Sequence, residues 1–420
     1  MSKERIILLT LAAINFTHIM DFMIIMPLGD MLMKVFDIGP QQFSFIVASY
    51  TISAGVSGFI AAFLIDRFDR KTALIFLYIG FTVGTLACAL APTYVILLVA
   101  RSLTGVFGGI LGALLLAVLA DVVPEERRGQ GMGFIMAAFS VASVAGVPFG
   151  YFLAEKISWH APFLLLSGFG LVILYMIWRY IPSLTAHMVS KSDRPGIRKV
   201  LHNAFSLPNQ QRALLFMMLL MLGQFTIIPF IAPYMIRNVG FESNQITYIY
   251  LIGGALTIFT SPIIGKLADK YGKLRVFTVF AILNILPLFA ITHMPPVHIA
   301  LALTVTGAFF IISGGRMIPA MAMITSSVKP QNRGSFMSIN SSVQQLSAGL
   351  ASFIAGLIVV QANDGSALQN YQYVGYVAIF ATILCIIVGQ RIVPAESVQT
   401  DKQTESSENL EAEVLVEEAK

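Results

Sequence analysis

The sequence predicts an all-α membrane protein in which twelve transmembrane helices form two pseudo-symmetric six-helix bundles. Three observations predict this class: the hydrophobic composition, twelve long apolar runs, and a repeat between the two halves of the chain. Hydrophobic residues make up 56% of the 420 residues and charged residues 12%, whereas a soluble domain has about 25% charged residues. In a bilayer, a run of about 20 apolar residues satisfies its backbone hydrogen bonds internally by forming a helix.

Twelve apolar runs are long enough to cross a bilayer, and one long connection divides them into two sets of six. The first run is longer than the apolar region of a cleavable signal peptide and lacks a small-x-small cleavage site. We therefore expect an N-terminal bundle in residues 1–180, a cytoplasmic linker at 181–212, a C-terminal bundle in 213–393 and a disordered acidic cytoplasmic tail at 394–420. The runs span residues 6–28, 43–65, 73–90, 94–119, 131–153, 162–180, 213–235, 246–264, 275–293, 297–323, 335–359 and 373–393.

The distribution of Lys and Arg predicts how the helices are oriented. If the amino terminus is cytoplasmic, 22 of the 27 Lys and Arg residues fall on the cytoplasmic side, three on the opposite side and two within spans. By the positive-inside rule, both termini are then cytoplasmic. We expect the protein to reside in the cell (inner) membrane. No basic stripe stands beside base-stacking aromatic residues, so nucleic-acid binding is not expected despite the net charge of +5.

The two halves of the chain repeat at a nearly constant offset. Asp66 follows the second span and Asp269 follows the eighth, 203 residues later. The same shift carries Asp21 in the first span onto Gln224 in the seventh, and an Arg-Gly pair recurs after spans four and ten at an offset of 205. These matches indicate duplicated six-helix halves, an architecture in which the ligand site lies at the interface.

The loop after the eighth span carries the most specific motif. Residues Gly265–Lys273 match the pattern G-x-L-a-D-r-x-G-r-k nearly intact. The chain thereby resembles the major facilitator superfamily of transporters, in the twelve-helix branch that contains proton-coupled drug and sugar exporters. The resemblance covers residues 5–393 approximately. The amino-terminal copy of the motif departs from the family pattern, with Ala62 and Asp69 where the family usually has glycine.

Both copies of this loop are expected to act as cytoplasmic gates. A carboxylate at a helix end can accept hydrogen bonds from a facing helix start and can pair with Arg or Lys. Asp66 together with Arg67, Arg70 and Lys71 would then latch the cytoplasmic side in one state, and an ordinary positive-inside loop is the alternative. The corresponding residues of the second copy are Gly265, Asp269 and Gly272.

A carboxylate and a guanidinium are expected to pair inside the N-terminal bundle. Arg101 begins an R-x-x-x-G segment in the fourth span that resembles a signature of the family. A charge near mid-bilayer costs about 2.5–3.5 kcal/mol on insertion scales, so it needs a partner or a water-filled cavity. Asp21 and Arg101 lie roughly 22 and 28 Å from the cytoplasmic ends of their spans, at similar depth.

These groups are the candidates for proton coupling. His18 stands one helical turn before Asp21, on the same stripe of the first span. We expect Asp21 to carry the proton, with Arg101 and His18 completing the coupling group. The alternative is a structural ion pair that only fixes helix packing.

Other polar residues within the spans are candidates for lining a substrate cavity. Arg316 in the tenth span has no acid at matching depth in its half, so we expect it to bind an anionic group of the substrate or to face water. A side chain that extends to a lipid headgroup is the alternative. Amides within spans can also serve only as interhelical hydrogen bonds. The remaining cavity candidates are Asn15, Gln224, Asn340 and Gln344.

The fifth span carries a helix-packing motif. Small residues recur every fourth position, including Gly146 and Gly150, and Pro148 is expected to bend the helix because it donates no backbone hydrogen bond. The segment is similar to the antiporter motif of the family, in which Gly and Pro are adjacent. Val147 separates them here, so antiport is suggested only.

Missing motifs exclude several other classes. The sequence contains no G-x-x-x-x-G-K-[ST], no H-E-x-x-H and no G-x-S-x-G, and its six histidines show no metal-ligand spacing. We therefore expect no enzyme, no metal and no cofactor.

Our interpretation is a secondary active transporter that exports a small organic molecule, such as a drug or a sugar, against proton entry by alternating access. Its expected partners are the small-molecule substrate, protons and the lipid bilayer, and the resemblance suggests a functional monomer. A proton symporter for uptake of a small solute is the first alternative. A non-transporting membrane sensor on the same fold is the second.

Overall fold

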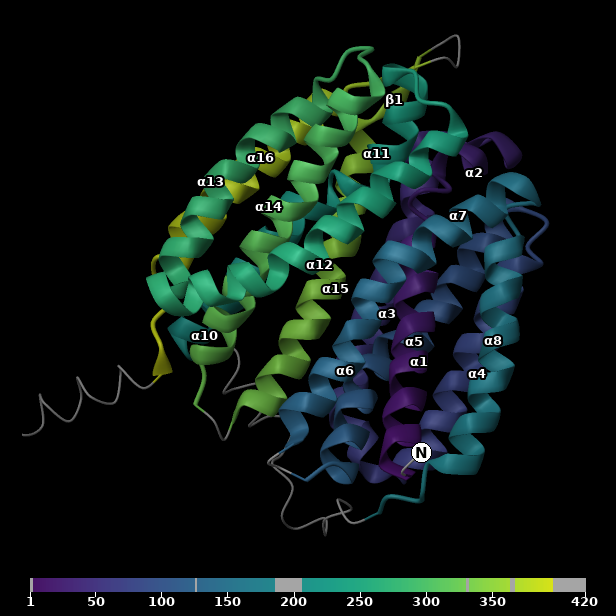
Figure 1. Cartoon of the computed structure of the whole chain (residues 1–420), viewed down its shortest axis with the longest axis vertical. Coiled ribbons are helices and arrows are strands. Elements are labelled where there is room, and N and C mark those ends of the chain that lie inside the picture. Colours follow the sequence, from purple (N-terminus) through teal and green to yellow (C-terminus); the bar gives the residue numbers. More distant parts are fainter. Residues whose placement is uncertain (1–2, 125–126, 186–205, 330–331, 363–366, 396–420) are drawn as a thin grey trace, which may run out of the picture.

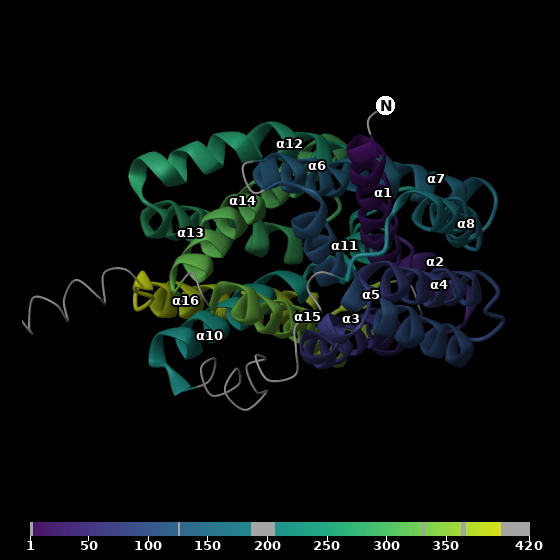
Figure 2. The same cartoon turned by 90° about the horizontal axis from the view of Figure 1, so that it is seen from below.

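The computed structural model describes residues 3–124, 127–185, 206–329, 332–362 and 367–395. Within these residues, twelve helical segments are long and apolar enough to cross a membrane, and each coincides with one of the predicted runs. The expected acidic tail and most of the expected linker lie outside the described residues. The fold is the predicted pair of six-helix bundles, with the N-terminal half beside the C-terminal half (Figures 1 and 2).

Six spans and one short helix form the N-terminal half. The fifth span is continued through a π-helical turn, Ala142–Gly146, that joins its two α-helical parts. The helices are α1 (Lys3–Ile24), α2 (Gly29–Val35), α3 (Pro40–Leu64), α4 (Arg70–Ala89), α5 (Tyr94–Val122), α6 (Arg128–Val141), α7 (Val147–Lys156) and α8 (Ala161–Tyr180).

The C-terminal half repeats this arrangement with a more broken first helix. Its elements are α10 (Pro208–Phe225), α11 (Ile228–Tyr234), a π-helical turn (Met235–Val239), α12 (Ile246–Tyr271), α13 (Lys273–Thr292), α14 (Ile299–Ser326), α15 (Arg333–Ile358) and α16 (Tyr371–Gly389). Two short antiparallel strands, β1 (Val360–Gln361) and β2 (Leu368–Gln369), stand between α15 and α16.

The helix boundaries depart from the expected spans at three places. The first helix ends at Ile24 rather than at residue 28, and the chain turns into the unpredicted helix α2. The seventh span breaks after Phe225, just before two prolines in α11. The fifth span contains a π-helical turn that ends two residues before Pro148, whose missing N–H removes a regular helical hydrogen bond.

The first residues of α1 and the last residues of α16 lie at the same end of the molecule, which we call the termini end (Figures 1 and 2). The opposite end is called the far end. At the far end, one hydrophobic core contains residues of both halves, including Leu28, Tyr151, Phe230 and Tyr371. At the termini end, each half has its own core. The halves therefore share a buried hydrophobic core at the far end, whereas their buried cores are separate at the termini end.

Close backbone contacts run along the seam between α3 and α15. A Cβ atom added at Gly349 of α15 would lie only 2.7 Å from the Thr51 hydroxyl oxygen and 3.2 Å from the Ile52 backbone nitrogen. On the other side of the interface, a Cβ atom at Gly254 of α12 would lie 3.0 Å from the carbonyl oxygen of Ser143. Small residues thus allow the two halves to approach at backbone distance.

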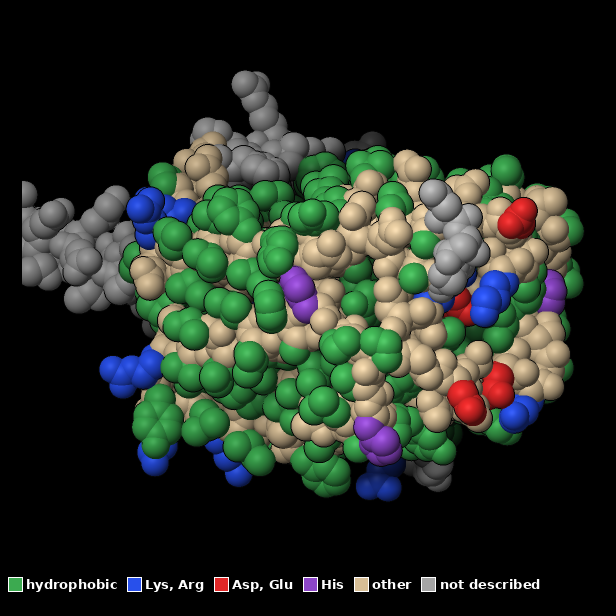
Figure 3. All heavy atoms as spheres, turned by 90° about the horizontal axis from the view of Figure 1, so that it is seen from above, with side chains coloured by type: hydrophobic (Ala, Val, Ile, Leu, Met, Phe, Trp, Pro, Cys, Tyr) green, Lys and Arg blue, Asp and Glu red, His purple; other side chains and the backbone are tan. Residues whose placement is uncertain are grey.

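A buried ion pair connects the two halves at the far end. Arg237 Nε of the C-terminal half lies 2.5 Å from Asp30 Oδ1 of α2, and these side chains are 7% and 4% exposed. The other oxygen of Asp30 accepts the exposed Lys34 ammonium at 2.8 Å, within the same helix. On the far-end surface, acidic side chains gather mostly over the N-terminal half (Figure 3).

Replacing Arg237 by Gln is expected to loosen the far end, because Asp30 then loses its only charged partner from the other half. Removing one partner of a buried ion pair typically costs about 3–5 kcal/mol. Pulsed EPR between spin labels at Ile157 and Asn244, which are exposed on opposite halves, should show a new population at longer distance. The labels require both native cysteines to be replaced.

Lys34→Gln is the matched control. It also removes a cation from Asp30, but this cation is 64% exposed and belongs to the same helix. We expect its distance distribution to equal that of the unsubstituted chain. A distribution for Arg237→Gln that also remains unchanged would show that the ion pair does not hold the halves together.

Candidate functional site

The structure brings Asp21 and Arg101 together at the centre of the N-terminal half. Arg101 Nη1 lies 2.7 Å from Asp21 Oδ2, and neither side chain has any exposed surface. The same nitrogen donates to the Asp21 carbonyl oxygen at 3.2 Å, and the Thr85 hydroxyl donates to Asp21 Oδ1 at 3.1 Å. Helices α1, α4 and α5 thus each contribute one residue to a closed polar cluster, and the carboxylate accepts on both oxygens.

Aromatic rings extend from this cluster to the C-terminal half. The Arg101 guanidinium carbon lies 4.3 Å from the centre of the Tyr50 ring in α3, within the range of a cation–π interaction. Phe22, the neighbour of Asp21, stacks on Tyr50 with ring centres 5.6 Å apart. On its other side, Phe22 lies 5.9 Å from Phe225 at the end of α10. A continuous series of side-chain contacts therefore connects the ion pair with the opposite half.

Several polar atoms around the ion pair are buried but have no hydrogen-bond partner among the described residues. They include Arg101 Nε and Nη2, the Tyr50 hydroxyl and His18 Nε2. The Tyr50 hydroxyl and His18 Nε2 both lie beside Gly108, where an added Cβ atom would come within 2.6 and 3.3 Å of them. Because buried polar groups are usually paired, this concentration of unpaired polar atoms makes the region a candidate functional site.

Asn15, the other polar residue of the predicted stripe, has a packing contact in this conformation. Its side-chain nitrogen donates to the Ile135 carbonyl oxygen at 3.0 Å and so ties α1 to α6. Its role in a substrate cavity remains a prediction.

The C-terminal half holds a second buried guanidinium. Arg316 in α14 has no exposed surface, and its Nη1 donates to the Thr382 hydroxyl of α16 at 3.1 Å. A Cβ atom added at Gly223 of α10 would lie 3.2 Å from the same nitrogen. Arg316 Nε and Nη2 have no partner among the described residues.

The predicted amides lie on α10 and α15. Asn340 is 1% exposed and neither atom of its amide has a partner among the described residues. Gln224 is half-buried with an unpaired oxygen, and Gln344 is half-buried. Asn284 of α13 was not predicted; its oxygen accepts from Ser313, while its nitrogen is unpaired among the described residues. The only sequence signal for Asn284 is that it is a polar residue within an apolar span.

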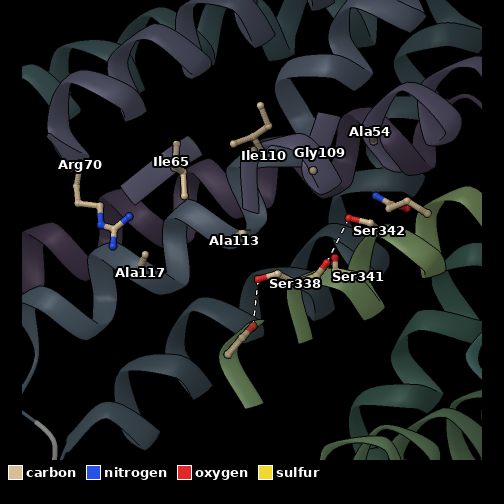
Figure 4. A pocket seen from close by; sticks show the side chains of 14 residues that line it. Ala54, Ile65, Arg70, Gly109, Ile110, Ala113, Ala117, Ser338, Ser341 and Ser342 are labelled. Carbon is tan, nitrogen blue, oxygen red and sulfur yellow. Dashed lines mark hydrogen bonds between the residues drawn. The ribbon is translucent and has the colours of Figure 1, made fainter. Parts of the chain in front are cut away.

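A cavity of about 210 Å³ lies between the two halves toward the termini end (Figure 4). Its C-terminal wall is a row of hydroxyls on α15 that the sequence analysis missed. Three serines supply this row, and two of them donate to carbonyl oxygens of their own helix at 3.2 Å. The spacing of three to four residues on one helix face is the signal that could have found them. The labelled residues that line the cavity are Ser338, Ser341, Ser342, Ala54, Ile65, Arg70, Gly109, Ile110, Ala113 and Ala117.

The first gate loop is held mainly by Asp69 and its neighbours within the N-terminal half. Arg70 is buried, and its Nε lies 3.3 Å from Asp121 Oδ2 at the end of α5. Lys71 Nζ donates to the Trp178 carbonyl oxygen at 2.8 Å. Arg67 is exposed, and the side chain of Asp66 lies outside the described part of the structure. A latch across the two halves therefore remains a prediction.

The second loop is more open. Asp269 is exposed and forms no ion pair within the described part of the chain. Gly272 ends α12 with φ +92°, a conformation that favours glycine, and an added Cβ atom would meet nothing within 4 Å. The space around Gly265 is similarly open. The positive φ at the end of α12 thus explains why the motif has glycine at position 272.

The glycines of the fifth span pack against α1. A Cβ atom added at Gly146 would lie 2.8 Å from the Met20 sulfur, and one at Gly150 would lie 2.9 Å from Ile24 Cδ1. Pro148 is buried between them as the second residue of α7. This face places the fifth span directly against the helix that carries Asp21.

The pKa of Asp69, which lies in the loop between α3 and α4, is set by the hydrogen bonds that its carboxylate accepts. Burial alone would raise the pKa of Asp69. Hydrogen bonds from the Leu184 backbone N–H and from the Thr72 hydroxyl and N–H outweigh that effect and hold the pKa below its usual range. Asp69 therefore both caps α4 and ties it to the segment after α8.

Asp69→Ala is expected to lower the free energy of unfolding by about 1 kcal/mol, the usual effect of losing a helix cap. Because the folded pKa is depressed, this stabilisation is present above the unfolded pKa and is lost as the pH falls through the folded one. Thermal unfolding should show the gap between the two chains closing in acid. Asp69→Asn, which keeps an uncharged cap, should show less pH dependence. A gap independent of pH would contradict this role.

Comparisons with known proteins agree with this geometry. The model of the Major Facilitator Superfamily matches residues 11–317 and 213–417. The chain is 25% identical over 369 residues to the uncharacterized MFS-type transporter YceJ of Bacillus subtilis, covering 87% of this chain and 90% of that protein. It is 27% identical over 201 residues to a probable sugar efflux transporter of Mannheimia succiniciproducens, covering 48% of this chain and 49% of that one.

A solved structure, that of a D-xylose–proton symporter, matches with a TM-score of 0.75 at 16% identity and covers 91% of this chain and 97% of that one. This likeness shows a shared fold. Among the described residues, no group of three or more His, Cys, Asp and Glu side chains could hold a metal ion. The chain belongs to the major facilitator superfamily, and it is a multi-pass membrane transporter rather than an enzyme.

Proposed function

We propose that the protein is a secondary active transporter of the cell membrane that exports a small organic molecule in exchange for protons, with both termini in the cytoplasm. The observation that carries the proposal is the fully buried Asp21–Arg101 pair, which is linked to the opposite half through the contacting rings of Tyr50, Phe22 and Phe225. Ionisable groups inside membrane spans are expensive, and their default explanation is function.

Proton coupling follows from the charge balance of this pair. In the closed arrangement, Asp21 is ionised and accepts from Arg101 and Thr85. When the pair loosens, the apolar surroundings favour the neutral carboxyl, so Asp21 takes a proton from the side to which it is open. Arg101 then keeps its contact with Tyr50 but loses its counter-charge. Protonation and substrate binding thereby bias the same two-state equilibrium.

The arrangement of the two halves supports a cytoplasm-facing state. The far end is closed by a shared hydrophobic core and by the Asp30–Arg237 pair, whereas the cavity beside α15 lies toward the termini end. With the termini in the cytoplasm, as the positive-inside rule favours, this state would admit a cytoplasmic substrate. Rocking of the halves about the glycine-rich seams would then open the far end.

Asp21→Asn should abolish flux driven by an imposed pH gradient in proteoliposomes, because an amide cannot carry the proton. The assay uses whichever member of a panel of drugs and sugars the unsubstituted chain transports. Since this change leaves Arg101 buried without a counter-charge, folding is checked by thermal unfolding. The double variant Asp21→Asn with Arg101→Gln removes both charges and serves if the single variant is unstable.

The matched control is Asp37→Asn. Asp37 is an exposed acid of the same half with a positive φ that Asn also tolerates. Its flux should equal that of the unsubstituted chain. Gradient-driven flux that persists in folded Asp21→Asn would refute the assignment of the proton carrier.

The direction of coupling separates export from uptake. The name of one relative refers to efflux, which favours antiport, while that of the structural neighbour refers to symport. Substrate added outside proteoliposomes should make the lumen more alkaline, because entering substrate drives protons out. Acidification of the lumen would instead establish the symporter. A sensor would lose its output when residues 397–420 are deleted, whereas a transporter should keep its flux.

A further inference from the structure

Arg316 lies deep in the bilayer region of the C-terminal half. It is ten residues from the end of α14 at Ser326, about 15 Å along the helix axis. It has no exposed surface and is flanked by Gly223 of α10 and Thr382 of α16. At this depth a lipid headgroup cannot reach it.

The positive charge of Arg316 has no counter-charge among the described residues of its half. Residues 213–393 contain only three acids. Glu242 and Asp269 are exposed near the two ends of α12, and Asp364 lies outside the described residues. None of the ion pairs among the described residues includes Arg316. A buried charge without a partner is costly, so a protein that retains one needs it for something other than stability.

The unpaired nitrogens of Arg316 have the geometry of a carboxylate receptor. Nη1 is occupied by the Thr382 hydroxyl, and the two nitrogens without a partner among the described residues are Nε and Nη2. Their N–H groups point in parallel from one edge of the planar guanidinium. This is the fork that binds both oxygens of a carboxylate or a similar oxyanion.

The helices that flank Arg316 carry apolar core residues, and α10 connects them to the proton site. Leu220 and Met221 of α10 and Cys385 of α16 belong to the buried core of this half. Two residues beyond Gly223 on α10, Phe225 contacts Phe22, the neighbour of Asp21. A ligand bound at Arg316 would therefore lie beside α10, the helix whose Phe225 connects to the proton-coupling pair through Phe22.

We propose that Arg316 binds the carboxylate of an amphipathic organic anion, and that such anions are the substrate class. This inference rests on the proposed transport function and deepens it. The carboxylate supplies the missing counter-charge, the fork fixes its orientation, and the apolar neighbours contact the body of the molecule. The site is closed in this structure, so the anion enters when the halves move.

The test is thermal unfolding of the purified full-length chain with phenylacetate and with phenylacetamide, its neutral analogue. A ligand that binds only the folded state raises Tm in proportion to its occupancy. Phenylacetate and the smaller acetate should raise Tm, whereas phenylacetamide and chloride at the same concentration should not. Arg316→Gln should lose this shift and should unfold at the same or a higher temperature, because an unmatched buried charge has been removed.

Two further variants make the result specific. Arg275→Gln removes an exposed cation of the same half and should keep the full shift. Arg316→Lys keeps the charge but lacks the parallel donors, so its shift should be smaller; it also replaces the Gln variant if that variant does not fold. The proton-coupling proposal is tested on Asp21→Asn by gradient-driven flux, and this inference is tested on Arg316→Gln by the Tm shift, so the two can fail separately.

Three results would overturn the proposal. The first is a Tm shift that does not depend on Arg316: phenylacetate raises Tm equally in the unsubstituted chain and in Arg316→Gln, or raises it in neither. The second is a shift by chloride alone, which would indicate a halide site. The third is a large loss of thermal stability in both Arg316→Gln and Arg316→Lys without any carboxylate effect, which would indicate a structural residue.

Discussion

The structure depends on two opposite charges buried together in the centre of a membrane bundle. Asp21 and Arg101 meet at 2.7 Å without any exposed surface. A buried ion pair is weak evidence for stability, because apolar residues of similar volume often stabilise a protein as well or better. Its presence is better explained by a need to separate and rejoin the charges. The surrounding residues suit that task, since Thr85 and Tyr50 support the two partners and Phe22 transmits their position to α10.

The two halves share a fold but differ in their charge balance. The repeat that places Asp21 in α1 places Gln224 at the corresponding position of α10, so the C-terminal half has lost the acid. It instead carries Arg316 on a helix whose repeat position in the N-terminal half is uncharged. Asp21 and Arg101 therefore balance each other within the N-terminal half, whereas Arg316 has no counter-charge among the described residues of the C-terminal half. In our account, the first half handles the proton and the second handles an anionic substrate, while the seams between them carry the movement.

Much of the fold follows from the sequence because the bilayer imposes length and hydropathy on each span. Matching depth was also enough to predict that Asp21 and Arg101 lie close together. Features that depend on how the halves meet could not be predicted. The Asp30–Arg237 pair joins residues 207 positions apart, on segments that show no signal of contact. The break after Phe225 and the hydroxyl row of α15 likewise depend on tertiary packing. The motif position Asp69 departs from the family pattern, and only the structure explains its presence as a helix cap.

The central claim is that Asp21 exchanges a proton as its pair with Arg101 opens and closes. Infrared titration of the reconstituted chain tests it most directly, because a protonated carboxyl has a C=O stretching band separate from that of a carboxylate. The account predicts a band from a buried carboxyl that appears on acidification, persists in Asp37→Asn and is missing from Asp21→Asn. A titrating band that is unchanged in Asp21→Asn would contradict it.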